Sequence, residues 1–263
     1  MEDLQLAASL VRDAGTLAAE MLLAGLETVQ KTSISDVVSA ADHAAEELIV
    51  SRLRQARPQD GLLGEEGTDV PGERRWVIDP VDGTYNFLSG IPIWCSAVAL
   101  EDAQGPILGA IYHPATSAGL PGSGDVAAGG EIWLGGREHP ASLNGVLLAP
   151  LAERPLADIS ISTYLHPTTL PDESLREPLL RVMRGAATVR MLGSGSVEMA
   201  AVAAGRLGAW VHANTKPWDW LPGAALIRAA GGAAEVIQAH GQRWHVAGNK
   251  RAVDEALALV AGA

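Results

Sequence analysis

Small apolar side chains recur every three or four residues along the first part of the chain. Between residues 4 and 25 the repeating positions are Leu4, Ala7, Ala8, Val11, Ala14, Ala18 and Leu22. This spacing places them on one face of a helix. A second helix is predicted from residue 40 to about residue 54, because Ser39 is a good N-cap and the same period returns after it.

Shorter apolar runs follow, and their length is typical of strands. The predicted strands lie at 62–63, 76–78, 97–100 and 107–112. Residues 115–146 are rich in Gly, Pro and Ser, which predicts a loop region with room for a hairpin near 131–134.

The second half of the chain alternates between the two patterns. Strands are predicted at 158–162, 188–191, 207–212 and 234–237. Helices are predicted at 175–183, from Ser194 or Ser196 to about 204, from Trp218 to about 231, and from Asn249 to the end. Helices packed on sheets are therefore expected, in an α+β or α/β arrangement. The change of pattern divides the chain into an N-terminal α+β half, 1–146, and a C-terminal α/β half, 147–263.

Two carboxylates stand three residues apart in the segment Asp79-Pro-Val-Asp82-Gly-Thr84. We expect a buried strand to end at Asp79, and Pro80 and Gly83 to form a tight turn. Such a turn would aim both aspartates, and the carbonyl of Val81, at one space, where a hard cation such as Mg²⁺ would find oxygen ligands. The free N–H groups of Gly83 and Thr84 could then hold a phosphate oxygen. Taken alone, the motif is equally an ordinary Asx turn.

Three further acidic positions bear on this choice. Glu65 follows an apolar strand, Asp219 stands between two tryptophans, and Asp42 falls in the first turn of the second helix. Each has an ordinary interpretation as a solvated loop residue, a helix N-cap or a residue stabilised by the helix dipole. A partly buried Asp219, however, would be costly without a cation beside it.

Together these segments resemble the inositol monophosphatase family of Mg²⁺-dependent, lithium-sensitive phosphatases. The resemblance is carried by residues 31–42, by Gly64-Glu65-Glu66, by residues 76–87 with their Asp-Pro-Val-Asp-Gly-Thr core, and by Lys216-Pro-Trp-Asp219. It implies a five-layered αβαβα sandwich, a homodimer, and hydrolysis of a small phosphorylated metabolite by direct attack of water.

The resemblance also implies roles for single residues. A first Mg²⁺ would be held by Glu65, Asp79 and the Val81 carbonyl, a second by Asp79, Asp82 and Asp219, and a third, weaker ion would lie near Glu65. Thr84 and Asp42, with Glu65, would orient and deprotonate the attacking water. The substrate contacts implied are Asp82, Gly83, Thr84, Gly195, Ser196, His212 and Asp219.

The substrate stays open at this point. His212 stands where inositol-specific members usually have a Glu that binds ring hydroxyls, or it is a strand-end histidine with no ligand role. Inositol 1-phosphate is the leading candidate, and fructose-1,6-bisphosphate, histidinol phosphate and a nucleotide 3′-phosphate are the alternatives. A different class of function is a macromolecule-binding regulatory factor of the transcription machinery.

Composition limits the class of protein, its partners and its expected location in the cell. Of 263 residues 48% are hydrophobic, which is enough to fill a core and excludes global disorder. A net charge of −12 argues against nucleic acids and anionic membranes as partners. The single cysteine, Cys95, excludes an intrachain disulfide, and together with the acidic N-terminus it predicts a cytoplasmic protein. Two or three Mg²⁺ ions would offset the acidic site, so phosphate esters should bind poorly without metal.

Overall fold

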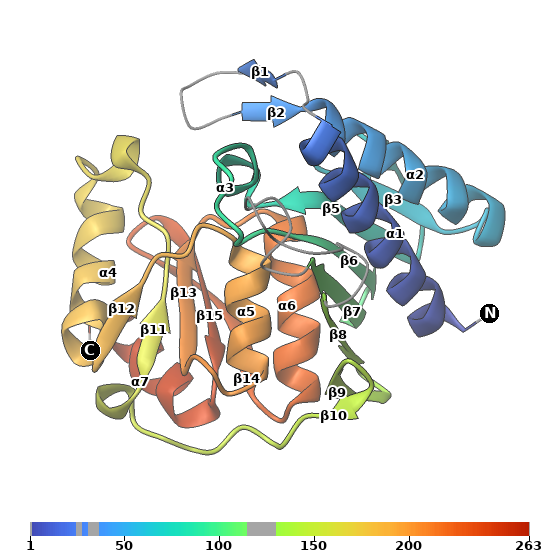
Figure 1. Ribbon diagram of the computed structural model, residues 1–263. Coiled ribbons are helices and arrows are strands. Elements are labelled where there is room, and N and C mark those ends of the chain that lie inside the picture. Colours follow the sequence, from blue (N-terminus) through green and yellow to red (C-terminus); the bar gives the residue numbers. More distant parts are fainter. Residues whose placement is uncertain (1, 25–27, 31–36, 115–129, 263) are drawn as a thin grey trace.

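The computed structural model describes residues 2–24, 28–30, 37–114 and 130–262, the strands 28–30 and 37–39 by their backbone only. Five layers alternate between helices and sheets (Figure 1). The expected αβαβα sandwich is therefore confirmed. Within the described residues no helix has both the length and the apolar character needed to cross a membrane.

Helices α1 (Asp3–Ala24) and α2 (Ala40–Ala56) form the first layer. Their apolar faces pack on the first sheet through a core that includes Leu10, Ile49 and Trp76. The predicted helical periods are confirmed, and α2 carries Asp42 in its first turn. Strands β1 (Thr28–Gln30) and β2 (Val37–Ser39) pair antiparallel beside this layer. The predicted cap of Ser39 and residues 31–36 lie outside the described side chains.

The second layer is an eight-stranded sheet in the order β10-β9-β8-β7-β6-β5-β3-β4. All neighbouring strands run antiparallel except β3 and β5, which run parallel. The strands are β3 (Gly61–Gly64), β4 (Asp69–Val70), β5 (Arg75–Asp82), β6 (Cys95–Asp102), β7 (Gly105–His113), β8 (Glu131–Gly136), β9 (His139–Leu143) and β10 (Val146–Leu147).

Two sequence-based expectations about this sheet were wrong. Residues 131–147 form three strands and not mainly a loop, although the predicted hairpin near 131–134 is present as β8 and β9. The glycines concealed the strand character of this segment, and at Gly136 a Cβ would overlap the carbonyl oxygen of Ile107. Strand β5 also continues through Asp82 and does not end at Asp79. Residues 115–129, the centre of the predicted loop, lie outside the described part.

The third layer consists of α5 (Gly195–Ala203) and α6 (Pro217–Ala229), which lie between the two sheets. The fourth is a five-stranded sheet in the order β12-β11-β13-β15-β14. Its strands are β11 (Ser160–Ser162), β12 (Thr188–Arg190), β13 (Ala209–Ala213), β14 (Ala233–Ala239) and β15 (Gln242–Gly248). The sequence did not predict β15, because its residues 244–248 are all buried and so lack the alternation of a half-exposed strand.

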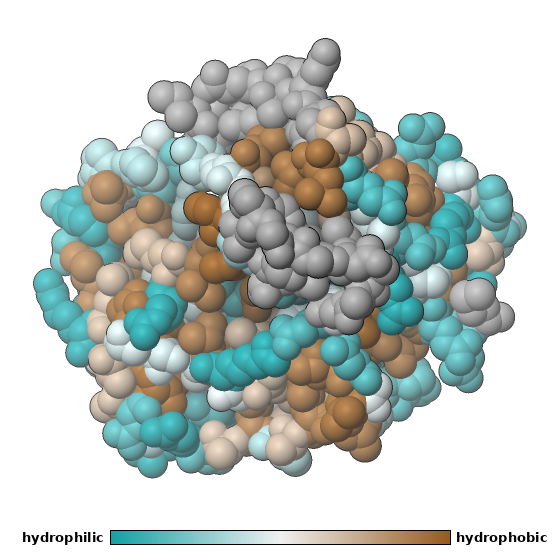
Figure 2. Space-filling view, in the orientation of Figure 1, coloured by the Kyte–Doolittle hydropathy of each residue, from teal (hydrophilic) through white to brown (hydrophobic). Residues whose placement is uncertain are grey.

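Helices α4 (Glu173–Gly185) and α7 (Lys250–Ala261) cover the outer face of the second sheet. The predicted cap of α7 is confirmed, because the Asn249 side chain accepts a hydrogen bond from the Ala252 N–H at 3.1 Å. Two 3₁₀ turns, Leu156–Asp158 and Pro167–Thr169, flank β11. Figure 2 shows hydrophobic side chains at the lower edge of the viewed face, over β9 and β10, where Val146 and Leu147 are exposed.

Candidate metal centre and active site

A β-bulge at the end of β5 turns two aspartates toward one space. Asp79 pairs with Ala97 of β6, but Asp82 pairs with Cys95, so β5 has one residue more than its partner between these pairs. Residues three apart in a regular strand point to opposite faces, and the extra residue cancels that alternation. Pro80 fits a bulge because it has no N–H to leave unpaired, and its carbonyl accepts a hydrogen bond from Ser96 Oγ at 2.5 Å. The bulge, and not a tight turn, therefore aims both carboxylates.

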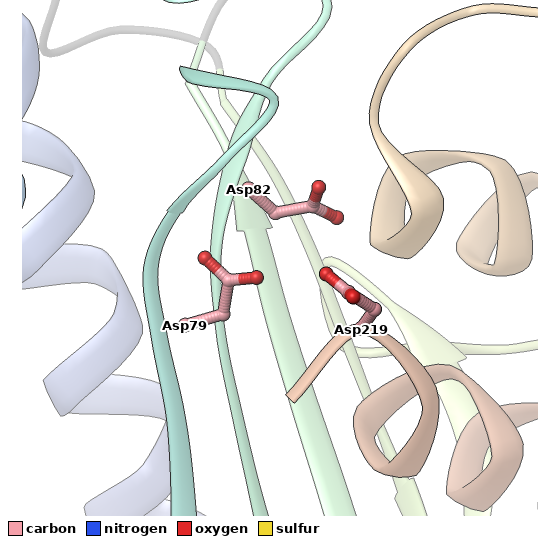
Figure 3. Close-up of side chains that lie close together, drawn as sticks. All are labelled: Asp79, Asp82 and Asp219. Carbon is pink, nitrogen blue, oxygen red and sulfur yellow. The ribbon is translucent and has the colours of Figure 1, made fainter. Parts of the chain in front are cut away.

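The third aspartate comes from the first turn of α6. Asp219 is the third residue of this helix and Lys216 is its N-cap, so the interpretation of Asp219 as the N-cap is wrong. Carboxylate oxygens of Asp79, Asp82 and Asp219 lie within 4.8 Å of one another. Figure 3 shows the three side chains pointing toward a common centre from β5 and α6.

The cluster has the electrostatics of a cation site. Asp79 is 1% exposed, and neither of its oxygens has a hydrogen-bond partner among the described residues. Burial, followed by the charges of Glu65 and Asp82, raises the pKa of Asp79 well above its ordinary value. An unpaired buried carboxylate is costly, and a divalent cation with oxygen ligands removes that cost. The described residues therefore fit Mg²⁺.

The pKa values of the neighbouring carboxylates are also raised. Burial and the charge of Asp219 raise the pKa of Glu65 to about 8. Burial and the charge of Asp82 raise the pKa of Asp219 to about 7. The pKa of Asp82 is also raised by burial, although its carboxylate accepts a hydrogen bond from the Ser196 N–H at the start of α5. Glu65 acts electrostatically on this cluster, but its carboxylate lies outside the compact group of three.

Thr84 and Asp42 also meet, as the resemblance predicted. Thr84 opens α3 (Thr84–Leu88), and its Oγ1 lies 3.3 Å from Asp42 Oδ1 and 2.9 Å from the Val81 carbonyl oxygen. Gly83 precedes the helix with φ 93°, a left-handed conformation that favours glycine. The first N–H groups of a helix have no intrahelical partners. One corner of the fold therefore holds the hydroxyl, the carboxylate and the N–H groups of Gly83 and Thr84.

The predicted cap of α5 is confirmed, and the two residues that follow it contact Asp82. Ser194 is its N-cap, with the Ser194 Oγ accepting a hydrogen bond from the Val197 N–H. The Ser196 N–H donates to Asp82, so in this arrangement it supports a cluster carboxylate. Gly195 lies between them and also donates its N–H to Asp82.

His212 sits on β13 among aromatic rings. The rings of Trp210 and Tyr164 lie 5.6 Å and 6.1 Å from it, and its Nδ1 is 3.1 Å from Thr215 Oγ1. Burial lowers the pKa of His212 to about 4, so it is neutral at physiological pH. The described residues show no hydrogen bond or ion pair between His212 and the three aspartates.

Two buried acidic residues with clear roles in this region had not been predicted. Glu198 accepts hydrogen bonds from the Leu192 N–H at 2.6 Å and from Trp210 Nε1 at 3.0 Å. The Leu192 carbonyl in turn accepts one from Asn86 Nδ2 at 2.7 Å, which ties α3 to α5 and β13. The other residue is Glu46 of α2, whose carboxylate holds the segment after Glu65. Its spacing of four residues from Asp42 on one helix was the signal that could have found it.

The fold and the site define a class of protein with five alternating layers of helices and sheets. Its carboxylate cluster, suited to divalent cations, lies where a strand of the first sheet meets a helix of the central layer. The chain belongs to the inositol monophosphatase family, whose profile matches residues 2–261. It is therefore a phosphatase of that family, related to enzymes that act on phosphate monoesters.

Individual relatives agree with this assignment. The chain is 39% identical over 203 residues to an inositol-1-monophosphatase of Rhizobium meliloti, covering 75% of this chain and 71% of the relative. It is 32% identical over 213 residues to the Nus factor SuhB of Xylella fastidiosa, covering 79% and 71%. The crystal structure of the extragenic suppressor protein suhB from Bartonella henselae superposes with a TM-score of 0.82 at 27% identity, covering 97% of each chain.

Proposed function

We propose that this protein uses Mg²⁺ to hydrolyse a small phosphate monoester, with inositol 1-phosphate as the leading substrate. The observation that carries the proposal is the convergence of Asp79, Asp82 and Asp219, with both Asp79 oxygens buried and no hydrogen-bond partner for them in the part of the chain that the structure describes. The relative of Rhizobium meliloti named inositol-1-monophosphatase supports the choice of substrate.

In this proposal five residues hold two or three ions: Glu65, Asp79, Val81 through its carbonyl, Asp82 and Asp219. Bound Mg²⁺ would neutralise the phosphate dianion and lower the pKa of a water molecule. A carboxylate cluster alone would repel the substrate, since all its groups carry the same sign as the phosphate. Metal binding must therefore come before productive substrate binding.

The chain's own groups would orient the reactants. The Thr84 hydroxyl lies within reach of Asp42, so a water donating to Thr84 could pass its proton to this pair or to Glu65. The N–H groups of Gly83 and Thr84 would hold equatorial phosphate oxygens as negative charge grows on them. Gly195 and Ser196 would form the opposite wall through the hydrogen bonds that fix Asp82.

The leaving group would meet a neutral, aromatic wall. His212 is uncharged and packs against Tyr164 and Trp210, so this described part of the wall presents a neutral imidazole to the ring hydroxyls and not a carboxylate. This observation keeps fructose-1,6-bisphosphate, histidinol phosphate and a nucleotide 3′-phosphate as alternatives within the same reaction.

A substrate panel tests the proposal. Phosphate release would be measured from the four compounds with metal-stripped protein, with and without Mg²⁺, and Asp82→Asn would serve as the inactive control. We expect Mg²⁺-dependent release and the highest kcat/KM for inositol 1-phosphate. No release from any of the four at saturating Mg²⁺ would reject the proposed reaction, and a higher kcat/KM for another compound would reject only the substrate.

A regulatory role through macromolecular contacts is the second candidate, supported by the similarity to a protein named Nus factor SuhB. The net charge of −12 favours a protein partner over direct RNA binding. A pull-down with the wild-type protein and Asp82→Asn tests it, since a partner retained equally by both would show a function independent of catalysis. The homodimer implied by the family is tested by light scattering of the purified protein.

A further inference from the structure

Glu46 is a buried carboxylate on the same face of α2 as Asp42, one helical turn further along. It is 4% exposed, and every hydrogen bond described for it comes from the segment after β3. Its Oε2 accepts from the Glu66 N–H at 2.8 Å. Its Oε1 accepts from the Thr68 N–H at 3.2 Å and from Thr68 Oγ1 at 2.7 Å. Both oxygens are therefore used to hold one short loop.

That loop carries Glu65 to the cluster. The Glu65 N–H donates to the Ile78 carbonyl at 3.2 Å, directly before Asp79 in β5. The Gly64 N–H donates to the Thr68 carbonyl at 2.7 Å, which closes the loop on itself. Glu65 is thus fixed on one side by β5 and on the other by the Glu46 carboxylate.

Gly64 shows how closely the loop after β3 packs against the Glu46 carboxylate. A Cβ at this position would overlap the Glu46 carboxylate, so only glycine leaves the space that the carboxylate occupies. The hydrogen bonds from N–H groups to an ionised carboxylate are about twice as strong as those between neutral groups. A neutral or shorter side chain at position 46 would leave the loop N–H groups poorly paired and Glu65 free to shift.

We propose that Glu46 is a positioning residue that holds Glu65 in place for metal binding. The inference rests on the proposed function, because it takes Glu65 as a metal ligand. Two acidic residues on one face of α2 would then have different roles: Asp42 contacts Thr84, and Glu46 anchors the loop that carries Glu65. Glu46 itself would touch neither metal nor substrate.

Mg²⁺ affinity separates this role from simple packing. Metal-stripped wild type, Glu46→Gln and the matched control Glu47→Gln, whose side chain is exposed on the same helix, would be titrated with Mg²⁺ by calorimetry. We expect about a tenfold to hundredfold weaker Mg²⁺ binding for Glu46→Gln, the range found when residues behind metal ligands are changed. The Mg²⁺ concentration for half-maximal phosphate release should rise equally, while kcat at saturating Mg²⁺ changes less. Glu47→Gln should match the wild type.

A second variant covers the case in which Glu46→Gln fails to fold. Thr68→Val removes one of the three hydrogen bonds from the loop side, and we expect it to weaken Mg²⁺ binding by a few fold. Unchanged Mg²⁺ affinity in folded Glu46→Gln, or in Thr68→Val if the first does not fold, would overturn the positioning role while leaving the proposed function intact. A wild-type protein that binds no Mg²⁺ would overturn both.

Discussion

At the scale of single residues, the site depends on positions where local geometry departs from the regular pattern. Asp79 and Asp82 point the same way only because β5 contains one extra residue between them. The sequence showed the two carboxylates and their motif, but Pro80 and Gly83 suggested a turn, since neither residue reveals the partner strand that a bulge requires. The candidate ligands were thus predictable from the sequence, but the β-bulge that orients their side chains was not.

Removing the charge of Asp79 should separate stability from activity. Asp79→Asn leaves the side-chain volume almost unchanged and removes a buried acidic group whose oxygens have no hydrogen-bond partner among the described residues. We expect phosphate release at saturating Mg²⁺ to fall by more than about 100-fold, beyond the range for residues behind the ligands. The melting temperature of the metal-free protein should stay equal or rise. Asp69→Asn, an exposed change on β4, is the control, and unchanged turnover in Asp79→Asn would refute its role as a ligand.

His212 offers a test of leaving-group selection. His212→Glu would place a hydroxyl-binding carboxylate between Tyr164 and Trp210, where the wild-type protein has a neutral ring. We expect the ratio of kcat/KM for inositol 1-phosphate over a nucleotide 3′-phosphate to rise about tenfold, which corresponds to the ~1.4 kcal/mol of one added hydrogen bond. His139→Glu on β9 is the control. A ratio that does not move would assign His212 to packing alone.

At the scale of elements, α6 joins the two sheets and delivers Asp219. Its apolar side chains share one core with residues of β6, β8 and β15, and its first turn lies at the cluster. The sequence predicted this helix and most others because a period near 3.6 is visible without knowledge of neighbours. Strands β8 to β10 and β15 were harder, because their Gly, Arg and His residues make sense only beside the elements that pack on them.

The approach of α6 to the first sheet should be sensitive to a single methyl group. A Cβ at Gly109 of β7 would overlap the carbonyl oxygen of Pro222 in α6, and backbone cannot move as freely as a side-chain end. We expect Gly109→Ala to lower the free energy of unfolding by about 1–3 kcal/mol. It should also weaken Mg²⁺ binding, because Asp219 moves with the helix.

Urea denaturation of the metal-free protein measures the first effect, and calorimetry measures the second. Gly185→Ala is the matched control, since a Cβ there would meet only side-chain ends, those of Leu259 and Leu156, and no backbone atom. A Gly109→Ala protein as stable as the wild type would show that the contact between β7 and α6 yields without cost.

At the scale of the whole molecule, the net charge of −12 hides an uneven distribution. Several of the acidic residues counted in this charge lie together in one buried place, where burial and neighbouring carboxylates raise the pKa of Glu65 and Asp219. Repulsion between these buried carboxylates is little screened by solvent. The stability of the metal-free protein should therefore depend on pH through this cluster.

The sign of that response follows from Glu65 and Asp219. Burial and neighbouring charges raise their pKa to about 8 and about 7 in the folded protein, whereas both titrate near ~4 when unfolded. The folded state then binds more protons at intermediate pH, so its stability falls as pH rises toward about 8. Below about pH 6.5 the unfolded state protonates His212 and His245, whose folded pKa values are lowered to about 4 by burial, which opposes the trend. The cleanest interval is therefore from about pH 6.5 to about pH 8.

Thermal unfolding in chelator should show a falling melting temperature across this interval. Mg²⁺ should raise the melting temperature more at the upper end than at the lower, since it competes with protons for the same oxygens. A variant carrying both Glu65→Gln and Asp219→Asn should give a flatter profile in chelator. A wild-type melting temperature that rises with pH in chelator would contradict the assigned shifts.

The separation of the three aspartates along the chain has a consequence for synthesis. Asp79 and Asp82 leave the ribosome early, while Asp219 follows only after most of the second sheet's strands. A nascent chain that has formed only its first sheet therefore has two of the three aspartates of the cluster. Under the proposed function, the chain would therefore not hydrolyse phosphate esters until α6 has docked on the first sheet.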